Sequence, residues 1–241
     1  MKRYRKYRKF KKFQKQLIVI LLATILGLLC LQSGYYLITG TTIPVLKQIN
    51  IGVKETDTSL GWNLILVNKD NRIPDDYEVD LIELSNGEKV DSRIYPQLQE
   101  MFDDARAVGL ELFVREGYRT ADDQQEVMTE QIQEYIEQGY SRSESKKLAK
   151  KYVAAPGTSE HQLGISVDIN ADTSVCSSDA VYTWLAENAY KYGFIKRYPS
   201  DKTDITGVYD EPWHYRYVGE EAAREIQERG LCLEEYIEQL H

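Results

Sequence analysis

Apolar residues are spaced in different ways along the chain, and the longest uninterrupted apolar stretch lies near the N-terminus. The run LIVILLATILGLLCL at residues 17–31 continues, after Gln32, Ser33 and Gly34, into YYLI. About 22 residues of this kind are enough to cross the hydrocarbon core of a bilayer, which is roughly 30 Å thick. The pattern therefore predicts a transmembrane helix over residues 17–38.

The residues before this run give the helix an orientation. Residues 1–16 contain nine lysines and arginines and no acidic residue, which places a basic tail in the cytoplasm and the rest of the chain outside the cell. A cleaved signal peptide is the alternative, because it also joins a basic leader to an apolar run. No A-x-A-like cleavage site follows the run, so we expect an uncleaved, single-pass anchor in the cell membrane.

Beyond the anchor, residues 39–60 have mixed composition and no periodic run, which is typical of a juxtamembrane stalk. We expect the folded extracellular domain to occupy residues 61–241. The segment NLILVNK at 63–69 alternates like a short strand or an extended segment, and DNRIPDDY after it is rich in turn formers.

Helical and strand periods then follow one another through the domain. Thr120, with Asp123 three positions later, resembles a capping box at the start of a helix, and a short amphipathic tail follows Gly230. The pattern predicts helices over 98–108, 121–138, 143–152, 179–192 and 219–229, and short strands at 110–114, 165–169, 193–195 and 214–218. Many helices with a few short strands indicate an α+β fold, with a small, mostly antiparallel sheet flanked by helices.

Charge and cysteine content exclude two classes of function. After the basic tail, 21 basic residues are outnumbered by all 38 acidic residues, and a net charge of −17 would repel nucleic acid. Three cysteines without a CxxC pair exclude a thiolate zinc knuckle. Whether Cys176 and Cys232 form a disulfide is left open by the sequence.

The three histidines of the chain provide the first chemical signal. His161 and Asp168 lie seven residues apart across a glycine-containing turn into a strand, so one corner can direct both side chains at a common point. With His214 they would form a set of two histidines and one carboxylate, which recurs in catalytic zinc sites that leave one position to water. We expect one Zn²⁺ per chain; the alternative is that these are ordinary half-buried histidines.

Two further residues could act on a substrate at such a site. Glu211 stands three residues before His214, where its carboxylate could act as a general base on the metal-bound water; otherwise it is a surface acid or a partner of a histidine. Arg119 lies at the start of the helix after the 110–114 strand. Its guanidinium could stabilise an oxyanion or bind a substrate carboxylate, and the alternative role is a salt bridge.

Two segments resemble a known family. SEHQLGISVD at 159–168 and EPWHYRYVG at 211–219 are similar to the motifs of the VanY-type zinc D-Ala-D-Ala carboxypeptidases, which the related L,D-carboxypeptidases share. The likeness includes LVNKDNRIPDDY, the GYRT segment with Gln124 after it, and GFIKRYPSDKTDITG, so it covers about residues 63–219. Two separated motifs in the same order make it specific.

This resemblance implies roles for individual residues. The implied zinc ligands are His161, Asp168 and His214; Glu211 is the implied catalytic base and Arg119 polarises the scissile carbonyl. The residues placed in the substrate pocket are Ser159, Gln124, Tyr118 and Trp213. The chain departs from the family pattern at Glu116, where serine is usual, and at Ser166, where alanine is usual. An acid at position 116 would change the charge of the pocket.

The function that follows from the resemblance is removal of the C-terminal D-alanine from peptidoglycan stem peptides, D,D- on a pentapeptide or L,D- on a tetrapeptide. An outward-facing, membrane-anchored domain would meet this substrate. Two rival functions stay open: an endopeptidase that cuts within stem peptides or cross-bridges, and a non-catalytic wall-binding module. A possible base beside the three ligands argues against the module. The oligomeric state is not indicated.

Overall fold

The computed structural model describes residues 53–241, which belong to one compact unit. The predicted basic tail, the anchor at 17–38 and most of the stalk lie outside the described residues. Among the helices of residues 53–241, none is both long and apolar enough to cross a bilayer.

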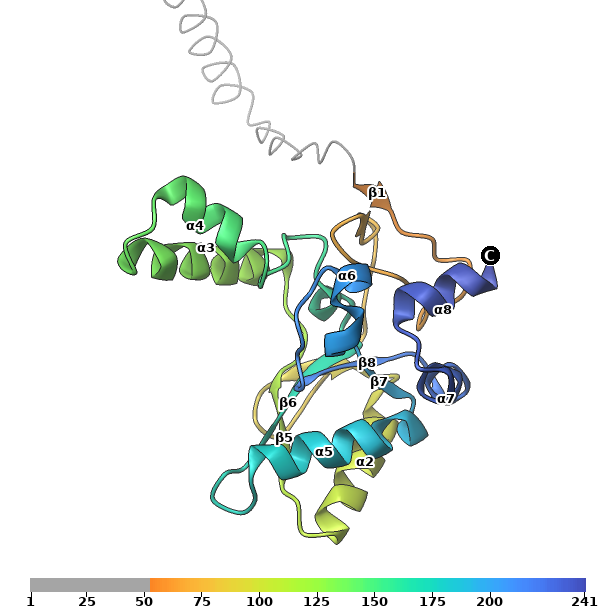
Figure 1. The fold of residues 1–241 in the computed structure, drawn as a ribbon. Helices are drawn as coiled ribbons and strands as arrows, with labels where there is room; N and C mark the ends of the chain where they lie inside the picture. The colour runs from red at the N-terminus through yellow and green to blue at the C-terminus, as the bar shows by residue number, and fades with distance from the viewer. Residues whose placement is uncertain (1–52) are drawn as a thin grey trace, which may run out of the picture. The chain divides into compact units, whose positions relative to one another are not determined.

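A four-stranded sheet lies at the centre of the unit (Figure 1). Its strands are, in spatial order, β5 (Leu112–Glu116), β6 (Ser166–Ala171), β8 (His214–Tyr217) and β7 (Phe194–Lys196). All three neighbouring pairs are antiparallel. The predicted α+β class with a small antiparallel sheet is thereby confirmed for the described residues.

The main core lies between this sheet and two helices, α2 (Tyr95–Ala107) and α5 (Ser178–Asn188), which contact β5 and β6 respectively. Because side chains alternate along a strand, Val167 and Ile169 point into this core while Asp168 between them faces the other way. The large side chains buried in the core include Ile94, Met101, Leu163, Ile165, Ile169, Leu185 and Phe194. The sheet therefore has one apolar face, and its opposite face is available for polar side chains.

Two smaller strand pairs precede α2. Strand β1 (Lys54–Glu55) pairs in parallel with β2 (Asn71–Arg72), and β3 (Leu81–Glu83) forms an antiparallel hairpin with β4 (Lys89–Asp91). The sequence analysis did not predict this hairpin. Its signal is the Asn86-Gly87 pair between two alternating segments, a common hairpin turn, with Gly87 at a φ of +89°.

Helices α3 (Ala121–Glu137) and α4 (Arg142–Ala149) pack on one another and project from the body of the unit (Figure 1). The predicted capping box is present, because the Thr120 hydroxyl accepts a hydrogen bond from the Asp123 N–H while the Asp123 carboxylate accepts one from the Thr120 N–H. Helix α4 ends at Ala149, three residues before its predicted end.

A second, smaller core lies under the two C-terminal helices, α7 (Glu220–Arg229) and α8 (Leu233–Leu240). Helix α8 is the amphipathic tail of the sequence analysis, and its side chains Leu233, Tyr236 and Ile237 are buried against α7 and β7. The remaining elements are short: η1 (Glu160–Leu163), η2 (Ala189–Tyr192), η3 (Ser200–Lys202) and α6 (Thr203–Thr206).

Residues 63–69 adopt one of their two predicted forms, whereas residues 53–60 differ from their predicted role. Residues 63–69 form no ladder with the sheet; Ile65 and Val67 are buried, and the Ile65 carbonyl accepts a hydrogen bond from Arg216 at 2.9 Å. This is the extended alternative, stabilised by a side chain rather than by a strand. Residues 53–60, expected in the stalk, belong to the compact unit, because β1 pairs with β2 and Thr56 donates to the Leu66 carbonyl.

Candidate active site

The polar face of the sheet brings together Asp168 and His214. Strands β6 and β8 pair so that Asp168 lies directly opposite His214, and opposite residues in an antiparallel pair have their Cβ atoms about 5 Å apart on the same face. The result is a distance of 3.0 Å between Asp168 Oδ1 and His214 Nδ1.

His161 reaches the same point from η1, the turn that leads into β6. Gly164 ends this turn at a φ of +71°, and a side chain there would meet the backbone of Asp91 at 3.2 Å. The backbone carbonyl of Gly117 accepts a hydrogen bond from His161 Nδ1 at 2.8 Å. Nε2 therefore carries the free lone pair of the imidazole, and it lies 3.5 Å from Asp168 Oδ1.

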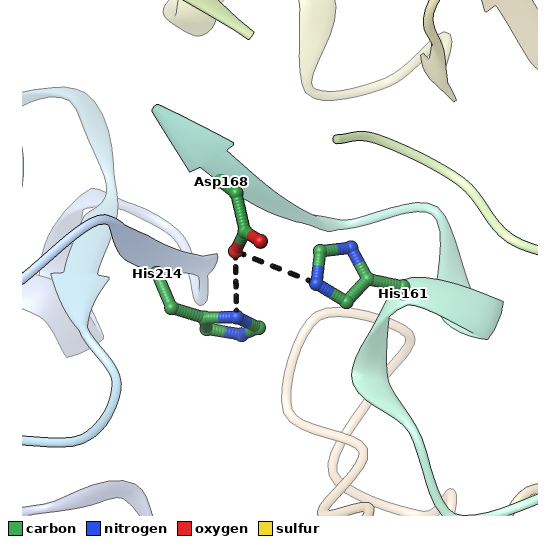
Figure 2. Close-up of side chains that lie close together, drawn as sticks. All are labelled: His161, Asp168 and His214. Atoms are coloured by element: carbon green, nitrogen blue, oxygen red, sulfur yellow. Dashed lines mark ion pairs between the residues drawn. The ribbon is translucent and has the colours of Figure 1, made fainter. Parts of the chain in front are cut away.

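Figure 2 shows the three side chains directed at one another. One ligand atom from each lies within 4.8 Å of the other two, and the histidine rings are nearly perpendicular at 88°. Asp168 Oδ1 and His214 Nε2 are buried, and neither has a well-directed hydrogen bond within residues 53–241. Two imidazoles and one carboxylate on one side of a common point fit a zinc ion with one position left for water.

The electrostatics of the cluster favour a cation. Burial opposes the charged form of His214, but Asp168, Glu160 and Glu211 raise its pKa to about 9. Burial by itself would raise the pKa of Asp168, yet the two histidines lower the pKa below its ordinary value. A site that holds a proton on a buried imidazole this strongly has a negative potential, which also attracts a metal cation.

Glu211 lies beside the same cluster. Its backbone N–H donates to the Tyr198 carbonyl at 3.1 Å, and its carboxylate Oε2 is 3.7 Å from His214 Nδ1. Burial raises the pKa of Glu211, and its side chain is 20% exposed. A carboxylate that is more basic than usual and adjacent to a metal position is suited to accept a proton from water.

Arg119 lies at the mouth of the site, and it is partly neutralised there. Its backbone N–H donates to the His161 carbonyl at 3.2 Å, and its Nε lies 3.3 Å from the Glu116 carboxylate. Glu116 faces the site because the register of β5 shifts between Val114 and Glu116, so that Glu116 pairs with Asp168. A local irregularity in a ladder redirects the side chains that follow it. The salt bridge considered for Arg119 is therefore present, whereas its role in binding a substrate stays a prediction.

The four residues expected in a substrate pocket occupy different surroundings. Ser159 and Gln124 are buried, and Gln124 Nε2 donates to the Ala154 carbonyl at 2.8 Å while its Oε1 has no hydrogen-bond partner in the described part of the chain. Trp213 is 37% exposed next to His214. Tyr118 lines a cavity of about 610 Å³ that lies between the β3–β4 hairpin and α3, together with Glu116 and Arg119.

Glu160, Arg197 and Arg216 are functional candidates that the sequence analysis did not single out. All three are buried, and Glu160 Oε2 lies 3.6 Å from His214 Nε2. Ser166, the second departure from the family pattern, donates its hydroxyl to the same carboxylate at 3.2 Å. In the sequence, two of these residues could have been suspected only from their neighbours: Glu160 precedes His161, and Arg216 lies in the motif that contains His214.

Cys176 and Cys232 do not form a disulfide with each other. Cys176 and Cys232 are both free; Cys176 is partly buried near the Glu111 backbone and Cys232 is buried at the start of α8. The domain is therefore held together without a covalent cross-link among its described residues.

The chain matches a protein-family model described as VanY, D-alanyl-D-alanine carboxypeptidase, over residues 87–220. A curated D-alanyl-D-alanine carboxypeptidase from Enterococcus faecalis (strain ATCC 700802 / V583) is 56% identical to it over 184 residues, which cover 76% of this chain and 69% of that protein. The family-model match at residues 87–220 includes both segments that carry the metal-binding candidates.

Two solved structures are similar to this one. The first is a mutant of the vancomycin resistance D,D-pentapeptidase VanY from a VanB-type resistance cassette, in complex with Zn(II); it is 58% identical, with a TM-score of 0.72, and the match covers 73% of this chain and 99% of that one. The second is VanYB in complex with D-alanine-D-alanine, with the same identity and TM-score and 98% of that chain covered.

Replacing Asp168 by asparagine tests whether the cluster holds a metal. Asparagine keeps the size of the side chain but removes its charge. Loss of a residue that only supports a metal ligand lowers metal affinity by up to about 100-fold. Loss of the ligand Asp168 itself should therefore lower zinc affinity by more than that. Competition with a chromophoric chelator measures this affinity. The control D172N changes a half-buried aspartate just beyond the same strand and should bind zinc like the parent. Equal affinity in D168N would remove Asp168 from the ligand set.

Proposed function

Because this chain belongs to the VanY family of D-alanyl-D-alanine carboxypeptidases, we propose that it removes the C-terminal D-alanine from peptidoglycan stem peptides by zinc-dependent hydrolysis. The observation that carries this proposal is the convergence of His161, Asp168 and His214 within 4.8 Å, with the Glu211 carboxylate 3.7 Å from one of the ligand nitrogens. The two solved complexes described above, one with Zn(II) and one with D-alanine-D-alanine, support it.

His161 Nε2, His214 Nδ1 and one carboxylate oxygen of Asp168 would hold the ion. Bound there, zinc would supply Lewis acidity and lower the pKa of water to about 7. Gly117 fixes the tautomer of His161 through the hydrogen bond to Nδ1, which leaves Nε2 free as a ligand.

Glu211 would take the proton from the attacking water and pass it to the amine of the departing D-alanine. Its raised pKa suits both steps, because a stronger base removes the proton more readily and the resulting acid can return it to the leaving group. A wall-binding module would gain nothing from a basic carboxylate in this position.

Arg119 would donate to the oxygen of the scissile carbonyl or to the terminal carboxylate of the peptide. Its side chain is only 14% exposed, so a substrate oxygen would meet it with little competing water. One well-placed donor of this kind contributes roughly 3 to 4 kcal/mol to stabilising the transition state.

The N-terminal part of the chain would deliver the enzyme to its substrate. We propose that residues 17–38 anchor the chain in the cell membrane, with residues 1–16 in the cytoplasm and the catalytic domain outside, because nine basic residues precede the apolar run. Protease added to intact cells should then digest the domain and spare the basic tail. A domain that is protected until the membrane is opened would contradict this topology.

The proposed activity is tested by incubating the zinc-loaded chain with penta- and tetrapeptide muropeptides and following the products by mass spectrometry. Loss of one alanine from the pentapeptide identifies a D,D-carboxypeptidase, and loss from the tetrapeptide identifies cleavage of an L-to-D bond. An internal cut would favour the endopeptidase, and zinc binding without any cleavage would favour the wall-binding module.

In the same assay, the variant E211Q should retain zinc and lose turnover. The amide cannot accept the proton of the attacking water, so kcat should fall by about 10²- to 10⁴-fold. The variant D210N alters the neighbouring exposed carboxylate, which pairs with Lys196, and should keep the parent rate. Unchanged kcat in E211Q would exclude Glu211 as the base.

Glu116 should weaken the binding of substrates that end in a carboxylate, because it places a negative charge beside Arg119. The variant E116Q is expected to lower KM by about two- to five-fold without changing kcat, a modest effect because the pair is partly exposed to solvent. Steady-state kinetics measure this, with the exposed α3 residue variant E134Q as the control. A higher KM would mean instead that Glu116 holds Arg119 in its working orientation.

A further inference from the structure

Helix α8 lies outside the segment matched by the family model, which ends at residue 220. One of its side chains, Glu234, nevertheless points inward and is 13% exposed. Its two carboxylate oxygens accept two hydrogen bonds from the Arg197 guanidinium, at 2.7 and 2.8 Å. Such a two-point contact is among the strongest and most directional that side chains make.

Arg197 connects this helix to the metal centre. Its side chain is fully buried, and its Nε donates to Glu160 Oε1 at 2.8 Å. The other oxygen of the same carboxylate, Oε2, is the one that lies 3.6 Å from His214 Nε2. The chain of contacts therefore runs from Glu234 through Arg197 and Glu160 to the rear nitrogen of a zinc-ligand candidate.

Arg216 is the fourth charge in this buried group. Its Nη1 donates to Glu160 Oε1 at 3.0 Å, and its Nη2 donates to the carbonyls of Asn63 and Ile65. The group thus contains two arginines and two glutamates, and its formal charges cancel. Buried charges are tolerated when they are paired, whereas removal of one partner leaves the others uncompensated.

We infer that Glu234 of α8 is a positioning residue for the zinc site: by balancing Arg197, it leaves Glu160 free to orient His214. This inference rests on the proposed function. Without Glu234, the two arginines behind His214 would be balanced by Glu160 alone, and the buried group would have a net charge of +1. That charge would draw Glu160 toward the two arginines and lower the affinity of the site for a cation.

The test is the zinc affinity of the full chain carrying E234Q. Glutamine has the same shape as glutamate but cannot balance Arg197, so we expect affinity to fall by about ten-fold, the lower end of the range for residues that support a metal ligand. A chromophoric chelator gives the affinity at a temperature well below unfolding. Parent affinity in E234Q would overturn the inference.

A second variant separates positioning from simple docking of the helix. Ile237 is buried in the small core of α8 and takes no part in the ion group. The variant I237A should lower the midpoint of thermal unfolding at least as much as E234Q while leaving zinc affinity unchanged. If I237A loses zinc affinity to the same degree, α8 acts by general stability and the positioning role is wrong.

A double variant tests the charge argument even if E234Q folds poorly. Replacing both members of the pair, in R197M/E234M, leaves Glu160 balanced by Arg216 alone. Zinc affinity should then recover toward the parent value relative to E234Q. A double variant that binds zinc more weakly than E234Q would show that the contacts, and not the balance of charge, are what matter.

The results distinguish a failure of the proposed function from a failure of this inference. A parent chain that binds no zinc and cleaves no muropeptide contradicts the proposed function itself. A parent chain that binds zinc and cleaves its substrate, together with an E234Q variant of equal affinity, contradicts only the role of α8.

Discussion

The antiparallel register between β6 and β8 is the constraint on which the rest of the site depends. It sets Asp168 opposite His214, and a shift of one residue would send one of them into the apolar core. Because Val167, Ile169, Tyr215 and Tyr217 must stay in that core, the hydrophobic effect itself fixes the two polar side chains on the opposite face. The metal-site geometry is thus held by the packing of residues that never touch the metal.

Charge is arranged around this geometry in two layers. In front of the sheet, Glu211, Arg119 and Glu116 face the region where a peptide would lie, and they are partly exposed. Behind His214, Glu160 and the two arginines are fully enclosed. The exposed group can exchange partners when substrate binds, whereas the enclosed group must keep its pairing to remain folded. In this VanY-family carboxypeptidase, the charged residues that can rearrange are therefore separate from the charged residues that must keep their partners.

The features that could be predicted from the sequence are those that depend on residues close to one another along the chain. The spacing of His161 and Asp168 across Gly164, the capping box at Thr120, and the helical periods all depend on neighbours within a few residues. The β3–β4 hairpin was missed although Asn86-Gly87 marks it. The link from Glu234 to Glu160 could not be predicted, because these residues are 74 positions apart and their meeting depends on how α8 docks. The anchor at 17–38 remains a prediction from hydropathy and charge.

Glu234 lies 20 positions after His214 in the sequence, and this has a consequence for the order in which the protein matures. Synthesis proceeds from the N-terminus, so every ligand candidate up to His214 is made before α8 is available to pair with Arg197. Until α8 has been made and has docked, Arg197 lacks the Glu234 carboxylate that balances its charge. All three ligand candidates can therefore be present in the growing chain before the charges behind His214 are balanced.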